Sequence, residues 1–226
     1  MSELEFKSAH RRNLPHYQPL GGTFFVTGCL SGSLPKSVLD WYKREKQRFT
    51  AQSHALPVSD RAKQELELQR QWFLRIEDAL HKAETGPTWL KDDRVAKIVK
   101  DAMHFYDEKR YRLDAYCVMR NHFHLVLAPV PITEWDETKA LTDNLHDTER
   151  DYSLSKIMHS IKSFTSKEAN KVLERSGTFW QGESHDRAVR DHQEWERTIA
   201  YVINNPVKAG LVAQWEDWPH TYLRPM

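Results

Sequence analysis

The sequence has few cysteines, no long apolar run and almost no net charge, and each shortage argues against a class of protein. The two cysteines, Cys29 and Cys117, lie in separate apolar runs, which indicates buried thiols, and without a Cys-x-x-Cys pair a zinc–thiolate site is not expected. No segment approaches the roughly 20 apolar residues of a membrane span, and the N-terminus lacks the apolar core of a signal peptide. We therefore expect a cytoplasmic protein with no membrane contact.

The net charge of +1 gives no overall attraction to nucleic acid, so any basic surface must be local. What the chain does have is apolar and aromatic material, with 39% hydrophobic residues and an aromatic share of 11% in 226 residues. This composition suits a folded domain and argues against disorder across the whole chain. We interpret residues 1–226 as one domain.

The first half of the chain predicts an arm, a strand and a long helical segment. Residues 1–20 are polar and carry Arg11 and Arg12 without any periodicity, as in an N-terminal arm. Residues 23–30 are rich in β-branched and aromatic residues and predict a buried strand. A helical insertion then covers 33–110. The periodic apolar positions and the cap and break signals within it predict helices at 35–50, 59–84 and 93–107.

The middle of the chain predicts a β-hairpin. Residues 111–119 form one strand, Arg120-Asn121 fits a two-residue turn, and a second strand begins at His122 and runs to about Ala128. The histidines of the segment His122-Phe123-His124 therefore stand at the start of the second strand.

The rest of the chain completes an α+β plan. Residues 134–151 carry seven acidic residues against one lysine and one arginine, which predicts a solvated acidic loop. A helix at 153–174, a strand within 179–189 and a helix from about 191 to Pro206 follow. This order predicts a ferredoxin-like antiparallel sheet with helices on one face and a helical insertion after the first strand.

His122 and His124 are candidate metal ligands. Side chains two apart on a strand point to the same face, so the two imidazoles project together while Phe123 points to the core. Two imidazoles on one rigid strand suit a divalent cation. The alternative is that both are polar residues on the solvent side of a strand, because His-x-His is common by chance.

Tyr201 and Asn205 are four residues apart in a helical pattern and so share one face about a turn apart. Asn205 offers a carbonyl oxygen to a hard cation, and Tyr201 offers a phenol oxygen as a nucleophile. The alternative is that Tyr201 packs in the core and that Asn204-Asn205-Pro206 only terminates the helix.

The chain resembles the REP-associated tyrosine transposases, which belong to the HUH single-tyrosine transposase superfamily. The resemblance lies in segments spread over nearly the whole chain: 11–16, 21–27, 119–124, 177–181 and 201–212. Two departures stand out, because Arg120 replaces a usual proline and His185 replaces an aromatic residue found in many relatives. The acidic loop is also longer than expected for this family.

The resemblance implies roles for the candidate residues. It makes His122 and His124 the metal pair, Tyr201 the nucleophile and Asn205 the third ligand of Mg²⁺ or Mn²⁺. The implied reaction is transesterification of single-stranded DNA through a 5′-phosphotyrosine, on repeated palindromes that fold into hairpins. The protein would act as a monomer or a homodimer.

The resemblance also implies DNA contacts and leaves two rival functions open. Arg11 and Arg12 could contact the base of the DNA hairpin, and the lysines of the helix predicted at 153–174 could follow the DNA backbone. These lysines are Lys156, Lys162, Lys167 and Lys171. The alternative for them is an ordinary solvated helix face. The rival functions are a catalytically silent DNA-hairpin-binding protein derived from a transposase, and a metal-dependent phosphodiesterase that uses water.

Overall fold

The structure is a computed structural model and describes residues 22–53, 57–130, 153–182 and 184–225. The predicted N-terminal arm at 1–20, with Arg11 and Arg12, and the predicted acidic loop at 134–151 lie outside the described residues. Within the described ranges, no helix is both long enough and apolar enough to cross a membrane.

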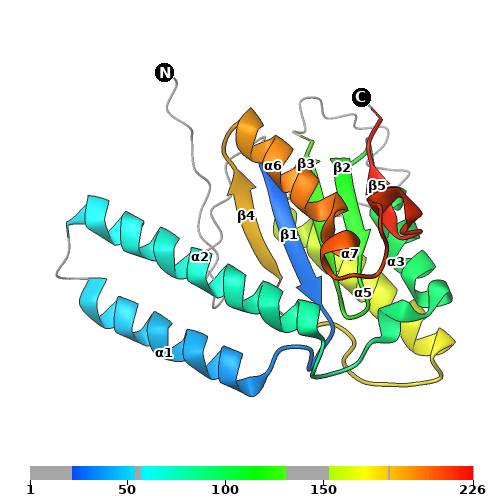
Figure 1. The fold of residues 1–226 in the computed structure, drawn as a ribbon, viewed down its shortest axis with the longest axis horizontal. Helices are drawn as coiled ribbons and strands as arrows, with labels where there is room; N and C mark the ends of the chain where they lie inside the picture. Colours follow the sequence, from blue (N-terminus) through cyan, green and yellow to red (C-terminus); the bar gives the residue numbers. More distant parts are fainter. Residues whose placement is uncertain (1–21, 54–56, 131–152, 183, 226) are drawn as a thin grey trace, which may run out of the picture.

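The described chain forms a five-stranded sheet in the order β4-β1-β3-β2-β5, and every pair of neighbouring strands is antiparallel (Figure 1). The strands are β1 Thr23–Cys29, β2 Tyr111–Val118, β3 His122–Pro129, β4 His185–Val189 and β5 Thr221–Leu223. The first four strands have the order of a ferredoxin-like fold. The predicted α+β class with an antiparallel sheet is therefore confirmed.

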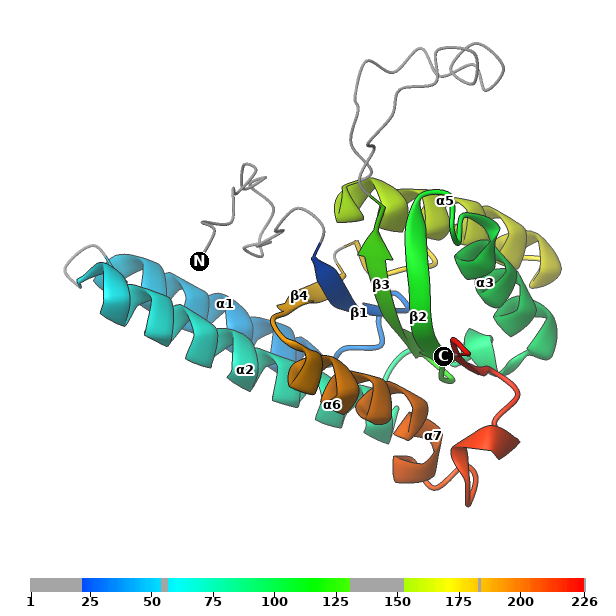
Figure 2. The ribbon, with the colours of Figure 1, turned by 90° about the horizontal axis from the view of Figure 1, so that it is seen from above.

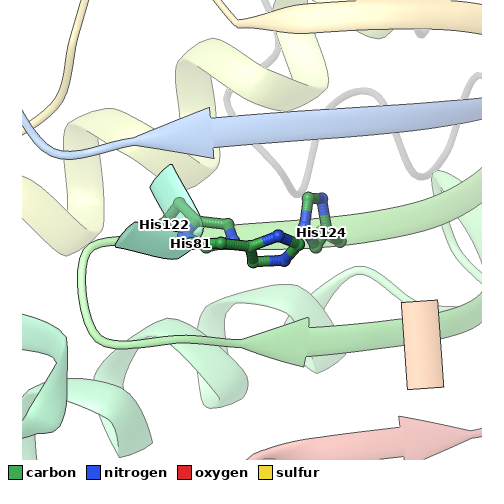
Figure 3. A group of neighbouring side chains, drawn as sticks. All are labelled: His81, His122 and His124. Atoms are coloured by element: carbon green, nitrogen blue, oxygen red, sulfur yellow. The ribbon is translucent and has the colours of Figure 1, made fainter. Parts of the chain in front are cut away.

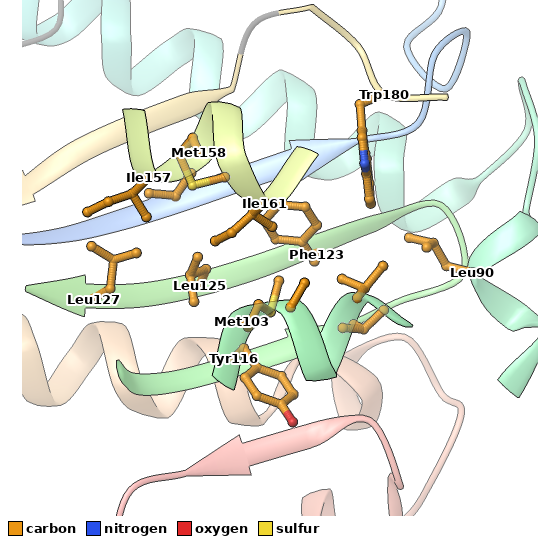
Figure 4. Close-up of a cluster of buried hydrophobic side chains, with 14 of the residues drawn as sticks. Leu90, Met103, Tyr116, Phe123, Leu125, Leu127, Ile157, Met158, Ile161 and Trp180 are labelled. Atoms are coloured by element: carbon orange, nitrogen blue, oxygen red, sulfur yellow. The ribbon is translucent and has the colours of Figure 1, made fainter. Parts of the chain in front are cut away.

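Two helices, α3 (Asp93–Phe105) and α5 (Leu154–Val172), cover one face of the sheet and pack against each other (Figure 2). Between them and the sheet lies a closed apolar core, to which β3 contributes Phe123, Leu125 and Leu127 (Figure 4). This face explains why alternate residues of β3 are large and apolar.

The opposite face of the sheet is covered by α2 (Val58–Lys82) and α6 (His192–Ile203), and α1 (Lys36–Ser53) packs on α2 (Figure 2). The prediction placed helices on one face, which holds for α3 and α5 only. A second layer forms because the sheet is apolar on this side too, where Phe25, Cys117 and Val126 pack with Ile199 and Val202. The remaining helices are short: η1 Trp89–Lys91, α7 Asn205–Lys208 and η2 Trp215–Asp217.

The hairpin that carries the histidines forms as predicted. Arg120 and Asn121 make the two-residue turn, and the backbone N–H of Met119 donates to the carbonyl of His122 at 2.8 Å. Asn121 is buried and ties the turn to its surroundings, since its backbone carbonyl accepts from the N–H of Leu30 at 2.9 Å. The turn therefore holds the start of β3 in a fixed place.

The strand predicted within 179–189 is shorter, and β5 was not predicted. Phe179 and Trp180 are buried in the α3–α5 core, and β4 begins only at His185. Residues 179–181 still pair with the end of β1, since the Gln181 N–H donates to the carbonyl of Cys29 at 2.8 Å and Trp180 forms an isolated bridge with Leu30. The pairing is interrupted after Gln181, where the Lys162 ammonium donates to the carbonyls of Gln181 and Gly182. The three residues of β5 are too few to show a strand pattern.

Candidate active site

The site begins with His122 and His124 on β3, whose side chains point to the face covered by α2 and α6. Both are buried, with 1% and 0% of their surface exposed. His124 lies opposite Thr27 of β1 and stacks on the ring of Phe25 at a centroid distance of 5.5 Å. The two imidazoles therefore do not lie on a solvent-facing strand surface, which was the alternative reading of the pair.

Hydrogen bonds fix the ring orientation of both histidines. His122 Nδ1 lies 2.7 Å from Asn121 Oδ1, while the Asn121 amide nitrogen donates to the carbonyl of Leu80 at 3.2 Å. Because that amide oxygen can only accept, His122 Nδ1 carries the proton and Nε2 keeps the lone pair. His124 Nδ1 lies 2.9 Å from Thr27 Oγ1. Burial, with the neighbouring His124, holds the pKa of His122 well below its usual value, so that ring is neutral.

The last turns of α2 bring two further polar side chains to the same place. His81 joins His122 and His124, and one candidate ligand atom from each lies within 4.8 Å of the other two (Figure 3). One turn earlier, Glu77 is only 4% exposed, and its Oε2 lies 3.4 Å from His124 Nε2. Burial alone would raise the pKa of Glu77, but the neighbouring His124 outweighs it and holds that pKa below its usual value. Glu77 is therefore a buried carboxylate.

Tyr201 on α6 faces this group from the other side. Its hydroxyl donates a hydrogen bond to Glu77 Oε2, and its ring lies edge-on to Phe25 at 6.0 Å. Burial, followed by the negative charge of Glu77, raises the pKa of Tyr201 above its usual value. The phenol is thus held protonated beside the imidazole pair.

Asn205, the predicted third ligand, stands at the start of α7 rather than on α6, because α6 ends at Ile203. It still lies next to the nucleophile candidate, since its amide nitrogen donates to the carbonyl of Tyr201 at 3.0 Å. Its amide oxygen lies 2.6 Å from His81 Nε2. The predicted residues His122, His124, Tyr201 and Asn205 are therefore brought together, with Glu77 and His81 between them.

The donor set fits a divalent cation. His122 Nε2, His124 Nε2 and Glu77 Oε1 are buried and have no hydrogen-bond partner within the described part of the chain. A buried polar atom without a partner costs about 1–3 kcal/mol, and neutral imidazole nitrogens and carboxylate oxygens are metal ligands. The three histidines could hold a metal ion here.

The predicted DNA-binding lysines lie elsewhere. All four are on α5, on the face of the sheet opposite to Tyr201. Lys162 donates to the backbone before β4, and Lys171 forms an ion pair with Glu168 at 2.7 Å. Lys156 and Lys167 have exposed side chains. Lys162 is thus used to shape the loop before β4.

Glu77 and His81 are the residues that sequence reasoning missed. A signal was present: the two lie four apart on a helix whose neighbouring positions Ile76 and Leu80 are apolar and buried. An acid and a histidine on the buried side of an amphipathic helix are candidates for a site. Their nearness to Tyr201, 124 residues away from Glu77, was not visible in the sequence.

Comparisons with known proteins agree with the family named from the motifs. No protein-family model matches the chain. Over 107 residues the sequence is 26% identical to a Haemophilus influenzae protein named "Putative REP-associated tyrosine transposase", a match that covers 47% of this chain and 56% of that relative. The chain thus spans little more than half the length of the curated relative that it matches.

A solved structure of a REP-associated tyrosine transposase bound to a REP hairpin has the same fold. The match has a TM-score of 0.50 and 18% sequence identity, and it covers 95% of this chain and 82% of the other. The predicted resemblance is therefore confirmed: the chain is similar to the REP-associated tyrosine transposases, in sequence over part of its length and in fold over nearly all of it.

Proposed function

We propose that the protein is a metal-dependent single-stranded DNA endonuclease and strand transferase that forms a 5′-phosphotyrosine through Tyr201. The observation that carries this proposal is one chain of contacts. The Tyr201 hydroxyl is bound to Glu77, and the same carboxylate oxygen lies 3.4 Å from His124 of the paired imidazoles. A nucleophile, a proton acceptor and candidate metal ligands thus form one buried group.

His122 and His124 would hold the cation, Mg²⁺ or Mn²⁺, through the ring nitrogens that have no other described partner. A bound divalent cation would supply positive charge to a phosphate oxygen and to the charge that develops during transfer. Thr27 and Asn121 hold the two rings in the orientation that keeps those nitrogens available.

Tyr201 performs the chemical step in this proposal. Its phenol oxygen attacks the phosphorus, a new O–P bond forms, and the bond from phosphorus to the 3′ oxygen of the preceding nucleotide breaks. Glu77 Oε2, which accepts the hydrogen bond of the phenol, receives its proton during the attack, and the departing 3′ oxygen takes up a proton to become a hydroxyl. A 3′ hydroxyl on another strand can attack the phosphotyrosine and reverse the step, so no nucleotide triphosphate is needed.

The surroundings of Tyr201 favour transfer to DNA over transfer to water. Phe25 and Phe73 lie against its ring, with centroids 6.0 Å away in both cases. Apolar walls exclude water from a reactive phosphotyrosine. The exposed ammonium of Lys208 lies 5.5 Å from the centre of the Tyr201 ring, where it can meet a phosphate of the bound strand.

The substrate class in this proposal is hairpin-forming palindromic repeats. It is supported by the related transposase, whose solved structure holds a REP hairpin. Arg11, Arg12 and the lysines of α5 remain the predicted hairpin contacts. The position of α5 on the far face of the sheet would let a hairpin stem and a cleaved strand contact different sides of the protein.

A covalent-adduct assay tests the proposal. The protein is incubated with Mn²⁺ and a single-stranded hairpin oligonucleotide labelled at its 3′ end, and the products are separated on a denaturing gel. We expect labelled protein from the wild type and from the control Tyr222→Phe, which changes a tyrosine of β5, and none from Tyr201→Phe. A 5′ label should instead appear on a shortened free strand.

Two outcomes would replace the proposal with a rival. Cleavage that survives Tyr201→Phe without any adduct would show hydrolysis by water. Hairpin binding by the wild type without cleavage would show a silent DNA-binding protein.

A further inference from the structure

We propose that His81 of α2, rather than Asn205, is the third ligand of the cation, and that Asn205 positions His81. This inference rests on the proposed cation site of His122 and His124. It assigns part of the catalytic centre to the helical insertion instead of the helix that carries the nucleophile.

The first support is the grouping of the three imidazoles. One nitrogen each from His81, His122 and His124 lies within 4.8 Å of the other two. Figure 3 shows the three side chains gathered in one place. The rings of His81 and His122 have centroids 6.0 Å apart, and those of His122 and His124 are 4.8 Å apart. Donor atoms this close can meet on a single cation after small side-chain movements.

The second support is the orientation of the Asn205 amide. Its nitrogen donates to the carbonyl of Tyr201 at 3.0 Å, which fixes the amide oxygen on the side of His81. That oxygen is 2.6 Å from His81 Nε2 and can only accept, so Nε2 is the donor and Nδ1 is the nitrogen left to bind a cation. Asn205 therefore uses its oxygen to orient an imidazole.

The third support is that His122 is held in the same way. Asn121 accepts from His122 with its amide oxygen and donates with its amide nitrogen to the carbonyl of Leu80. In both pairs an asparagine, locked by a backbone carbonyl, sets which nitrogen of a histidine is free. Metal-binding histidines commonly donate their second N–H to such a partner.

The backbone around His81 is fixed well enough for a ligand. His81 lies in the last turn of α2, which ends at Lys82 and is followed by Ala83 with φ 48°. Leu80 beside it is buried and accepts the Asn121 hydrogen bond, so this helix end is joined to the hairpin that carries the other two histidines. All three ligands thus belong to one rigid assembly.

The ligand set has a consequence for the choice of metal. A site with an amide oxygen in third place suits a hard cation such as Mg²⁺, whereas a third imidazole nitrogen suits transition-metal ions, among which Mn²⁺ is the weakest binder of the first-row series. We therefore expect the protein to bind Mn²⁺ much more tightly than Mg²⁺ in the absence of DNA.

The test is metal binding without DNA, with two readouts. Calorimetry gives the Mn²⁺ affinity, and electron–nuclear double resonance on ¹⁵N-histidine-labelled protein counts the imidazole nitrogens coupled to the bound ion. We expect three coupled nitrogens in the wild type, two in His81→Ala and in His81→Gln, and three in Asn205→Ala. The affinity should fall by at least about 100-fold in His81→Ala and by about 10-fold in Asn205→Ala.

The controls distinguish a failure of this inference from a failure of the proposed cation site and of the proposed function. His81→Gln keeps a donor toward Asn205 and guards against a folding defect, and His159→Ala on α5 removes an exposed histidine without effect. Two coupled nitrogens in the wild type that persist in His81→Ala would overturn the inference. If the Tyr201-dependent adduct still forms in that case, the proposed function stands. No Mn²⁺ binding by the wild type would overturn both the cation site and this inference.

Discussion

The two faces of β3 differ in whether their buried side chains find suitable partners. On the α3 and α5 side, Phe123, Leu125 and Leu127 are fully buried and belong to a core of apolar side chains. On the α2 and α6 side, His122 and His124 are equally buried, yet each has a ring nitrogen with no hydrogen-bond partner among the described residues. One strand, by simple alternation, builds a stable core and a polar site.

This difference separates the residues that stabilise the fold from those that could take part in a reaction. The unpartnered nitrogens and the buried carboxylate of Glu77 each destabilise the apo fold by about 1–3 kcal/mol. The apolar face offsets that loss, since burial of one large side chain contributes about 1.5–3 kcal/mol. Substitutions of Phe123, Leu125 and Leu127 should therefore act on stability, and those of the polar residues around His122 and His124 on chemistry.

The largest expected effect is on the apolar face. Phe123 is fully buried, its ring lies edge-on to Trp180 at 5.2 Å, and a Cβ added at Gly28 would lie 2.4 Å from its Cζ. The ring therefore fills its space completely. Phe123→Ala should lower the free energy of unfolding by about 3–5 kcal/mol, measured by urea denaturation.

The matched control is Phe105→Ala on α3, where the side chain is 63% exposed and the free energy of unfolding should change by less than about 0.5 kcal/mol. A loss below 1 kcal/mol for Phe123→Ala would show that the apolar face does not carry the stability assigned to it here.

The next largest effect concerns Glu77, beside the histidines of β3, and it should leave the free energy of unfolding nearly unchanged. Glu77→Gln keeps the size of the side chain and a hydrogen bond to Tyr201 but removes the proton acceptor. Adduct formation should slow by about 100-fold or more. The free energy of unfolding should change little, because the lost attraction to His124 and the removal of a buried charge oppose each other. Single-turnover gels and urea denaturation measure the two quantities.

Glu67→Gln is the control on the same helix, because Glu67 is exposed and pairs with Arg70 at 2.8 Å. It should change neither quantity measurably. If Glu77→Gln lowered the free energy of unfolding and left the adduct rate unchanged, Glu77 would contribute to stability and not to the reaction.

Much of the sheet could be predicted from the sequence because the signals are local. β-branched and aromatic runs gave β1, β2 and β3 within one or two residues, and alternation placed both histidines on one face. The element order sufficed for the ferredoxin-like plan. The grouping of Tyr201 with Asn205 followed from their four-residue spacing, although a helix break lies between them.

The parts that could not be predicted depend on contacts across the fold. Nothing local to α2 shows that its end meets the start of β3, and Glu77 reaches Tyr201 over 124 residues of chain. The second helical layer depends on how α2 and α6 pack on a sheet that is apolar on both sides. The proposal that His81 replaces Asn205 as third ligand depends on a tertiary contact between the two side chains, which lie 124 residues apart in the sequence.

The smallest expected effect compares one exposed lysine on each face, and it concerns DNA binding. Lys208 lies over the Tyr201 ring, whereas Lys167 is on α5 behind the sheet. With a single strand that cannot form a hairpin, Lys208→Ala should reduce the slope of log Kobs against log salt by about 0.7, because one phosphate contact is lost. Lys167→Ala should leave that slope unchanged, as measured by fluorescence anisotropy over a salt series. An equal reduction by both substitutions would mean that the single strand contacts both faces of the sheet. DNA binding would then not be confined to the face that carries Tyr201.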